Sequence, residues 1–101
     1  MITETFEEIG RKVGKLVDEK NAVYGDSFAK SGDFLRLCYP DGIRPDQYED
    51  ALCLVRIFDK QMRIATDKDA FGETPYQDIS GYGLLGMKNY SKGQPDAGEK
   101  V

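Results

Sequence analysis

The stretch PDQYEDALCLVRIFDKQMRIAT, residues 45–66, decides the fold class of this chain. Its apolar side chains recur every three or four positions, which is the spacing of one face of an α-helix and not the alternation of a β-strand. Pro45 suits the first position of a helix, and the acidic residues that follow it favour a helix N-terminus. We therefore predict a helix over residues 45–66. Its predicted core stripe consists of Tyr48, Leu52, Val55, Phe58 and Met62.

The same helical period continues towards the N-terminus. Thr5 and Glu8 have the spacing of a capping box, so we predict a helix over residues 5–20. Gly25 ends this segment, and a second helix is predicted over residues 27–38.

Towards the C-terminus, Thr74, Pro75 and Gln77 form a start signal for a helix over residues 75–90. This helix contains three glycines, each of which costs about 1 kcal/mol relative to alanine, so either close helix packing or room for a ligand must compensate. Residues 91–101 hold almost no apolar side chains, and we predict that they form a disordered tail.

Four helices joined by short loops predict an all-α fold with one four-helix bundle-like domain over residues 1–90. The chain has 101 residues, which is the size of a single domain. Four short helices barely enclose a core, so we expect an oligomer, with a dimer as the simplest form.

The composition excludes several classes of function. The sequence contains no histidine, which rules out Ser-His and Cys-His catalysis and histidine-ligated zinc. Its 14 basic and 18 acidic residues leave a net charge of −4, which disfavours binding to duplex nucleic acid. No apolar run approaches the roughly 20 residues that span a bilayer. Cys38 and Cys53 sit in apolar sequence and predict buried, reduced thiols, so we expect a cytoplasmic protein.

One face of the helix predicted over residues 45–66 is charged. At positions i, i+3, i+4 and i+7 it carries Arg56, Asp59, Lys60 and Arg63. This stripe is either a solvated face, because Asp59 can pair with both arginines, or a binding site for phosphate. In the second case Lys60 and Arg63 contact phosphate, and Asp59 orients them or holds a metal ion.

The helix predicted over residues 75–90 carries Asp78 and Tyr82 one turn apart on the same face. Asp78 lies in the first turn, where a carboxylate also stabilises the helix dipole. If this helix packs beside the charged stripe, Asp78 faces Asp59, and two carboxylates on facing helices can hold Mg²⁺.

Four stretches taken together resemble a known family. They are KNAVYGDSF (20–28), IRPD (43–46), VRIFDKQMRI (55–64) and YQDISGYGLLG (76–86). They look like sequences of phage- and prophage-encoded helical proteins described as nucleotide-modification-associated, which are similar to the all-α nucleotide pyrophosphohydrolases called MazG-like. The resemblance covers about residues 16–87.

The resemblance implies an all-α domain that assembles as a dimer or higher oligomer and takes a nucleotide or another phosphorylated small molecule. In the hydrolytic members, Mg²⁺ held by acids on two helices activates water against the α–β phosphate linkage. In this chain Asp59 and Asp78 would hold the metal, with Glu73 or Asp26 assisting. The substrate-binding residues would be Lys20, Lys60 and Arg63 for the phosphates, and Tyr24 or Tyr82 for the base.

The sequence departs from the hydrolytic pattern in its acidic pairs. Those members carry an ExxE pair on one helix and an ExxD pair on the next, whereas Arg56 and Met62 occupy the paired spacings around Asp59 here. Three hypotheses about the function remain open. The protein is a Mg²⁺-dependent nucleoside triphosphate hydrolase, a non-catalytic protein that sequesters a (signalling) nucleotide, or a purely structural helical oligomer. A phage-encoded protein of either nucleotide-binding kind would act in the cytoplasm of the host cell.

Overall fold

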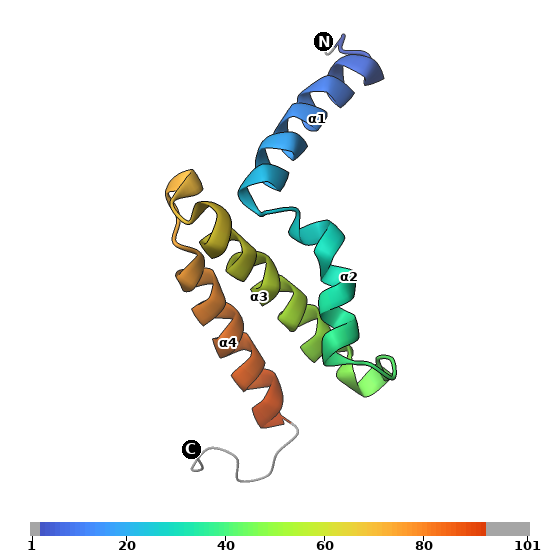
Figure 1. Ribbon diagram of the computed structural model, residues 1–101, viewed down its shortest axis with the longest axis vertical. Helices are drawn as coiled ribbons and strands as arrows, with labels where there is room; N and C mark the ends of the chain where they lie inside the picture. Colours follow the sequence, from blue (N-terminus) through green and yellow to red (C-terminus); the bar gives the residue numbers. More distant parts are fainter. Residues whose placement is uncertain (1–2, 93–101) are drawn as a thin grey trace.

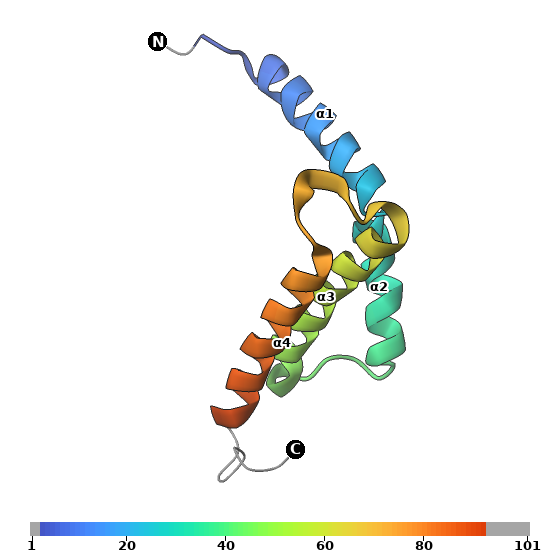
Figure 2. The same ribbon diagram turned by 90° about the vertical axis from the view of Figure 1, so that its left-hand side faces the viewer.

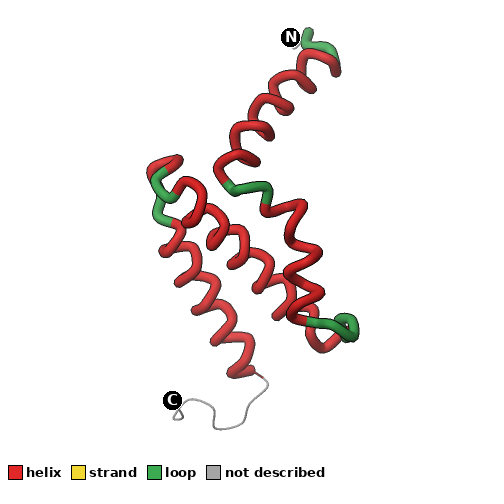
Figure 3. Tube along the Cα trace, viewed as in Figure 1, coloured by secondary structure: helices red, strands yellow, loops and turns green. Residues whose placement is uncertain are grey.

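The structure is a computed structural model that describes residues 3–92, and this part of the chain is helical without a strand (Figure 3). Its elements are α1 (Phe6–Val23), α2 (Ser27–Cys38), the short 3₁₀ turn η1 (Pro45–Gln47), α3 (Tyr48–Asp67), a second turn η2 (Ala70–Gly72) and α4 (Pro75–Lys92). The predicted all-α fold is thereby confirmed. None of these helices is long and apolar enough to cross a membrane.

Helix α3 is the centre of the arrangement, because both α2 and α4 pack along it (Figure 1). Helices α3 and α4 run in opposite directions, joined by the turn that contains η2. Helix α1 meets the others only near its C-terminal end and projects away from them, as the perpendicular view also shows (Figure 2). Within residues 3–92 the four helices therefore do not close the expected four-helix bundle.

The helix bounds match the sequence pattern closely, with three differences. Helix α1 runs on to Val23, three residues beyond its predicted end. Residues 45–47 form the 3₁₀ turn and not the start of α3, because the backbone N–H of Gln47 donates to the carbonyl of Arg44 only three residues earlier (2.9 Å). Helix α4 continues to Lys92, so the predicted tail boundary at 91 is wrong by two residues. The rest of that predicted tail lies outside the described residues.

The N-terminus of α1 is capped as its sequence predicts. The Thr5 hydroxyl accepts a hydrogen bond from the backbone N–H of Glu8 (3.2 Å), and the Glu8 carboxylate accepts one from the backbone N–H of Thr5 (3.3 Å). Helix α2 begins differently. Asp26 precedes it in a left-handed conformation (φ 58°) and makes no side-chain capping bond.

Gly25 forms the tight turn between α1 and α2. Its φ is +60°, a region that side chains with a Cβ rarely adopt. A Cβ built there would lie 2.5 Å from the Thr66 Oγ1 and 3.2 Å from the Met62 Cε, so the turn is pressed against α3. Two constraints, one on the backbone and one on packing, therefore require glycine at this position.

The described chain buries little apolar surface. Ala51 is its one fully buried hydrophobic residue, and Phe34 and Phe58 stack between α2 and α3 with ring centroids 4.6 Å apart. The predicted core stripe of α3 is confirmed only in part, because Tyr48 and Leu52 at its N-terminal end are 53% and 62% exposed.

Two further expectations from the sequence do not hold within this chain. Cys38 is exposed and Cys53 half-buried, although both were expected in the core, and both are free thiols. The three glycines of α4 have open space where a Cβ would stand, so close packing against another helix of residues 3–92 does not compensate for them, and room for a ligand stays a prediction.

We predict that Gly25→Ala lowers the free energy of unfolding by about 1–3 kcal/mol, because it adds backbone strain and a clash with Thr66. Gly14→Ala is the matched control. It places the same methyl group on α1, outside the apolar stripe of that helix and where nothing lies within 4 Å of it, and should be neutral or stabilise the protein by up to about 1 kcal/mol. Urea unfolding followed by circular dichroism measures both, and equal effects of the two substitutions would contradict the close approach at Gly25.

Candidate functional site

Side chains from all four helical segments meet at one place, which we call the junction cluster. Its members are Tyr24, Ser27, Asp59, Lys60 and Asp78. Tyr24 follows the last residue of α1, Ser27 opens α2, Asp59 and Lys60 are neighbours on α3, and Asp78 lies in the first turn of α4. The cluster joins residues that lie between 18 and 36 positions apart in the chain.

Lys60 is the central member of the cluster. Its ammonium donates a hydrogen bond to the Tyr24 hydroxyl (3.1 Å) and forms an ion pair with the Asp78 carboxylate (3.1 Å). The ammonium also lies 5.3 Å from the centroid of the Tyr24 ring, within the range of a cation–π interaction. The Lys60 side chain is 17% exposed and that of Asp78 35%, so solvent reaches the pair from one side.

These partners keep Lys60 positively charged. Burial by itself lowers the pKa of the ammonium and is the largest single influence, but the hydrogen bonds and charge attraction of Tyr24 and Asp78 together outweigh it. The pKa of Lys60 is therefore raised above its ordinary value.

Ser27 and Asp59 form the second contact of the cluster. Ser27 is 4% exposed, and its hydroxyl donates a hydrogen bond of 2.7 Å to the Asp59 carboxylate. The hydroxyl thus ties the start of α2 to α3 instead of capping its own helix. If the charged stripe were a solvated face, Asp59 would pair with Arg56 or Arg63, but its carboxylate accepts its hydrogen bond from Ser27.

Next to the junction cluster, an open groove of about 560 Å³ lies in the bend between α1 and α2, and we call it the elbow groove. Its lining is mainly apolar and comprises Leu16, Val17, Lys20, Asn21, Tyr24, Asp26, Ser27 and Phe28. Tyr24 and Ser27 belong both to the groove and to the junction cluster. The groove therefore brings Lys20, a predicted substrate-binding residue, to the same region as Lys60.

Arg63 occupies a different position from the one predicted. It is 1% exposed, and its guanidinium donates hydrogen bonds to the backbone carbonyl oxygens of Ala70 and Glu73, the latter at 2.5 Å. The guanidinium also lies 5.7 Å from the centroid of the Phe71 ring. The predicted contact of Arg63 with phosphate does not fit this placement, because the group is enclosed by the turn that connects α3 to α4.

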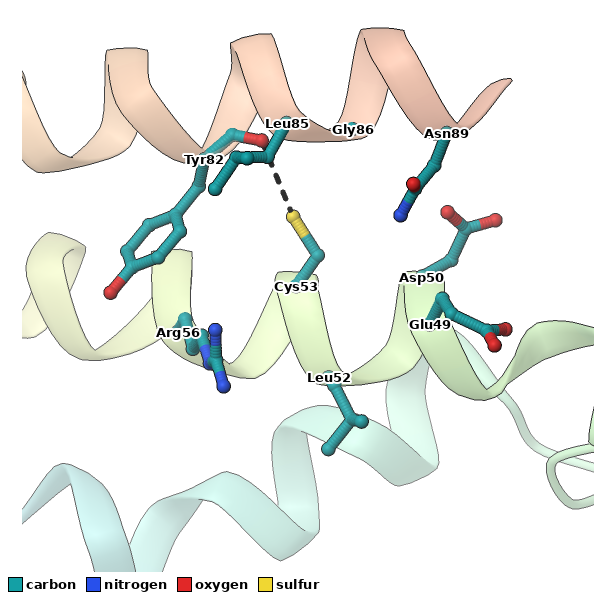
Figure 4. A pocket seen from close by; sticks show the side chains of 9 residues that line it. All are labelled: Glu49, Asp50, Leu52, Cys53, Arg56, Tyr82, Leu85, Gly86 and Asn89. Atoms are coloured by element: carbon teal, nitrogen blue, oxygen red, sulfur yellow. Dashed lines mark hydrogen bonds between the residues drawn. The ribbon is translucent and has the colours of Figure 1, made fainter. Parts of the chain in front are cut away.

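Tyr82 lines a hollow on α4 together with Asp78, but its ring contacts a residue outside the junction cluster. Its ring faces the exposed Arg56, whose guanidinium is 5.9 Å from the ring centroid. The two residues form one end of a small cleft between α3 and α4 with a volume of about 250 Å³ (Figure 4). Glu49 and Asp50 lie at the opposite end of the cleft. Between the two ends, the Cys53 thiol contacts the backbone carbonyl of Tyr82 (3.7 Å).

The two predicted metal ligands already have partners within the chain. The Asp78 carboxylate is paired with the Lys60 ammonium, and the Asp59 carboxylate with the Ser27 hydroxyl. A Mg²⁺ ion needs several oxygen ligands and is repelled by an adjacent ammonium. Residues 3–92 contain no group of three or more acidic or thiol side chains that could hold a metal ion. As they are paired within residues 3–92, Asp59 and Asp78 therefore do not by themselves form a magnesium site.

The sequence thus predicted Tyr24, Asp59, Lys60 and Asp78 as members of one site, and the structure places all four in the junction cluster. The sequence did not assign Ser27 to the site, because a serine after a glycine turn is equally typical of a helix start. The pairing of Arg56 with Tyr82 was also missed, since only the packing of α4 on α3 brings them together.

Comparison of the chain with protein-family models yields no match, and neither a curated protein nor a solved structure is significantly similar to it.

The raised pKa of Lys60 predicts how stability depends on pH. A group whose pKa is higher in the folded state stabilises that state fully below its unfolded pKa, about 10.4 for lysine, and the contribution disappears as the pH rises through the folded value. We therefore expect wild type to be more stable than Lys60→Met at neutral pH, with the difference shrinking only above about pH 10.4. Urea unfolding of both proteins across the alkaline range measures this, and a difference that does not change with pH would contradict it.

The placement of Arg63 predicts a structural role. Arg63→Met removes the buried donor that holds the backbone carbonyls of Ala70 and Glu73 and should lower the free energy of unfolding by about 1–3 kcal/mol. Arg56→Met, the control on the exposed face of the same helix, should cost less than about 1 kcal/mol. If the two variants unfold at the same urea concentration, the turn at residues 70–73 does not depend on Arg63.

Proposed function

We propose that the protein binds a nucleotide, or another small phosphorylated molecule, at the junction cluster and the adjoining elbow groove, without hydrolysing it. The observation that carries the proposal is the placement of the Lys60 ammonium beside an aromatic ring that opens onto an apolar groove. A charged head next to an aromatic and apolar wall suits a ligand with a phosphate at one end and a flat base at the other.

The Lys60 ammonium has a donor to offer such a ligand. It carries three N–H groups, of which the Tyr24 hydroxyl and the Asp78 carboxylate account for two. Lysine is a frequent point-charge partner of phosphate, and the raised pKa keeps it charged at all physiological pH values. Lys20 in the elbow groove supplies a second positive charge for the same anion.

Tyr24 is the residue on which we expect the base to lie. Its ring lines the elbow groove together with Leu16, Val17 and Phe28. Stacking of a base on an aromatic side chain contributes about 1–3 kcal/mol and is tolerant of base identity. The resemblance of residues 20–28 and 55–64 to nucleotide-modification-associated proteins supports the same class of ligand and a role in phage nucleotide metabolism.

The non-catalytic form is favoured over the hydrolase by the pairing of Asp78. A carboxylate neutralised by an ammonium is a poor metal ligand, and the second acid of each expected pair is absent. A Mg²⁺-dependent pyrophosphohydrolase is the alternative within the same family resemblance. It would require Asp78 to leave Lys60 for the metal once a triphosphate has bound.

We also propose that the protein works as an oligomer. Large apolar side chains on α1, α2 and α4 are exposed in the single chain, and large exposed apolar patches mark interaction surfaces. On α4 these are Leu84, Leu85, Met87 and Tyr90. An oligomer would cover them and would also explain glycines whose Cβ positions are open within one chain.

A ligand screen tests the proposal directly. Nucleosides, their mono-, di- and triphosphates and inorganic phosphate are tested by thermal shift, each with and without Mg²⁺. A ligand present at 100 times its dissociation constant should add about 2.7 kcal/mol of stability. We expect stabilisation by phosphorylated nucleotides and not by nucleosides, without turnover. Release of pyrophosphate in the presence of Mg²⁺ would instead establish the hydrolase, and no stabilisation by any of them would overturn the proposal.

Variants then locate the site. Lys60→Met should weaken nucleotide affinity at least tenfold, equivalent to about 1.4 kcal/mol, whereas Lys88→Met on the exposed surface of α4 should leave it unchanged. Tyr24→Phe keeps the ring and should lose less affinity than Tyr24→Leu. Equal affinity in all four variants, measured by isothermal titration calorimetry, would place the site elsewhere.

A further inference from the structure

Helix α1 carries an uncovered apolar stripe, which we call the α1 face. Its members and their exposed fractions are Phe6 94%, Ile9 40%, Val13 53%, Leu16 48% and Val17 55%. None of the 18 residues of α1 is buried. In both views the helix stands clear of α2, α3 and α4 except near the elbow, so those helices do not cover the stripe (Figures 1 and 2).

An isolated helix of this length is marginal in water, and most helices are stabilised by packing of their apolar face. The α1 face therefore needs an external cover. The spacing of the α1 face indicates what kind of surface covers it. Phe6, Ile9, Val13 and Leu16 are separated by alternating steps of three and four residues. That is the seam of a two-helix coiled coil, whose usual occupant is another helix of the same pattern.

We infer that a second copy of this chain covers the α1 face, through antiparallel pairing of the two α1 helices that places Phe6 of each copy at the edge of the elbow groove of the other. The inference deepens the self-association proposed above and does not depend on the nucleotide.

The charges of α1 determine whether the two α1 helices pair in the parallel or the antiparallel direction. Lys20 continues the seam one step beyond Leu16. In a parallel pair, Lys20 would face the partner's Lys20, and two ammonium groups in one layer repel each other. In an antiparallel pair with Val13 against the partner's Leu16, Lys20 faces the partner's Ile9, and its stem packs while its charge reaches water. The helix dipoles also attract each other only in the antiparallel pair.

The flanks of the seam fit the same register. On one side Lys12 lies opposite the partner's Glu19, and the symmetry of the dimer forms this pair twice. Within its own chain Lys12 already contacts Glu4, so it stands between two acids in the dimer. On the other side Gly10 lies opposite the partner's Val17, and the glycine, with open space around its Cβ position, permits close approach.

The register also places Phe6 at the candidate ligand site. Phe6 lies opposite the partner's Val23, directly before the partner's Tyr24 and the elbow groove. A helix of 18 residues is about 27 Å long, and a seam of this length alone falls short of the roughly 1,600 Å² of a standard interface. The groove of about 560 Å³ and the exposed Phe28 at its edge extend the contact. The partner's Phe6 thus completes the apolar wall beside Lys60.

Sedimentation velocity over a concentration series tests the interface. Wild type should be a dimer or larger, and Val13→Glu should shift the association midpoint at least a hundredfold upwards, because it places a charge in the centre of the seam. Lys15→Glu, on the opposite side of the same helix, is the matched control and should shift it less than threefold. A monomeric wild type, or equal effects of the two substitutions, would overturn the inference.

A charge swap tests the pairing on the flank. Lys12→Glu should weaken association at least tenfold, and the double variant Lys12→Glu, Glu19→Lys should recover it. The two residues lie two turns apart on one helix, so they cannot pair within a chain. A double variant no stronger than the single one would overturn this register while leaving self-association in place.

Disulfide formation tests the direction. In a Cys38→Ser background, oxidation of a mixture of Ile9→Cys chains and differently tagged Lys20→Cys chains should link one of each kind. Efficient linking of Ile9→Cys chains to themselves would show a parallel pair and overturn the inference. Both outcomes are read without any nucleotide, so they are independent of the proposed ligand.

Discussion

The ammonium of Lys60 is the contact on which the arrangement of the helices depends. It sits on α3, the helix against which the others pack, and holds the end of α1 through Tyr24 and the beginning of α4 through Asp78. A largely buried charge is stabilised by pairing and hydrogen bonding, and Asp78 and Tyr24 supply these contacts to Lys60. The adjacent bond from Ser27 to Asp59 attaches α2 at the same level of α3. One short segment of α3 therefore orients all three remaining helices.

The turn between α1 and α2 determines the direction in which α1 leaves the junction. Gly25 and Asp26 both adopt positive φ, and the turn packs closely against the C-terminal part of α3. Helix α1 consequently leaves the junction in a direction that carries its apolar stripe away from α2, α3 and α4 (Figure 1). Residues 3–92, which bury only Ala51 among their hydrophobic side chains, have too little core to account for the fold alone, and their exposed apolar faces indicate where further contacts are made.

Structure and proposed function meet in the same few side chains. Lys60 and Tyr24 hold the helices together and also form the wall and charge of the candidate ligand site, because a groove opens where α1 turns away. Asp78 restricts which ligands the site can take, since it neutralises part of the positive charge of Lys60, and the same ion pair makes it a poor metal ligand. A phosphate bound there would compete with a carboxylate for one ammonium, which favours ligands that gain further binding energy from the apolar groove.

The sequence by itself determined everything that depends on neighbours along the chain. The capping box of Thr5, the helical period, the bounds of α2 and the start of α4 at Pro75 follow from contacts within one or two turns, and each appears where it was predicted. It also indicated Lys60 and Asp78 as members of one site, because both lie on faces that a neighbouring helix would bring together.

Only the tertiary structure decided what each face meets. The spacing of Arg63 placed it on the charged stripe, but the turn after α3 folds back over it and turns a predicted phosphate ligand into a buried donor to two backbone carbonyls. Tyr82 likewise pairs with Arg56 and not with the junction cluster, because the packing of α4 on α3 determines its neighbour. The period of a helix states which residues share a face, whereas the loops and the partner helices determine which of those faces is covered, and by what.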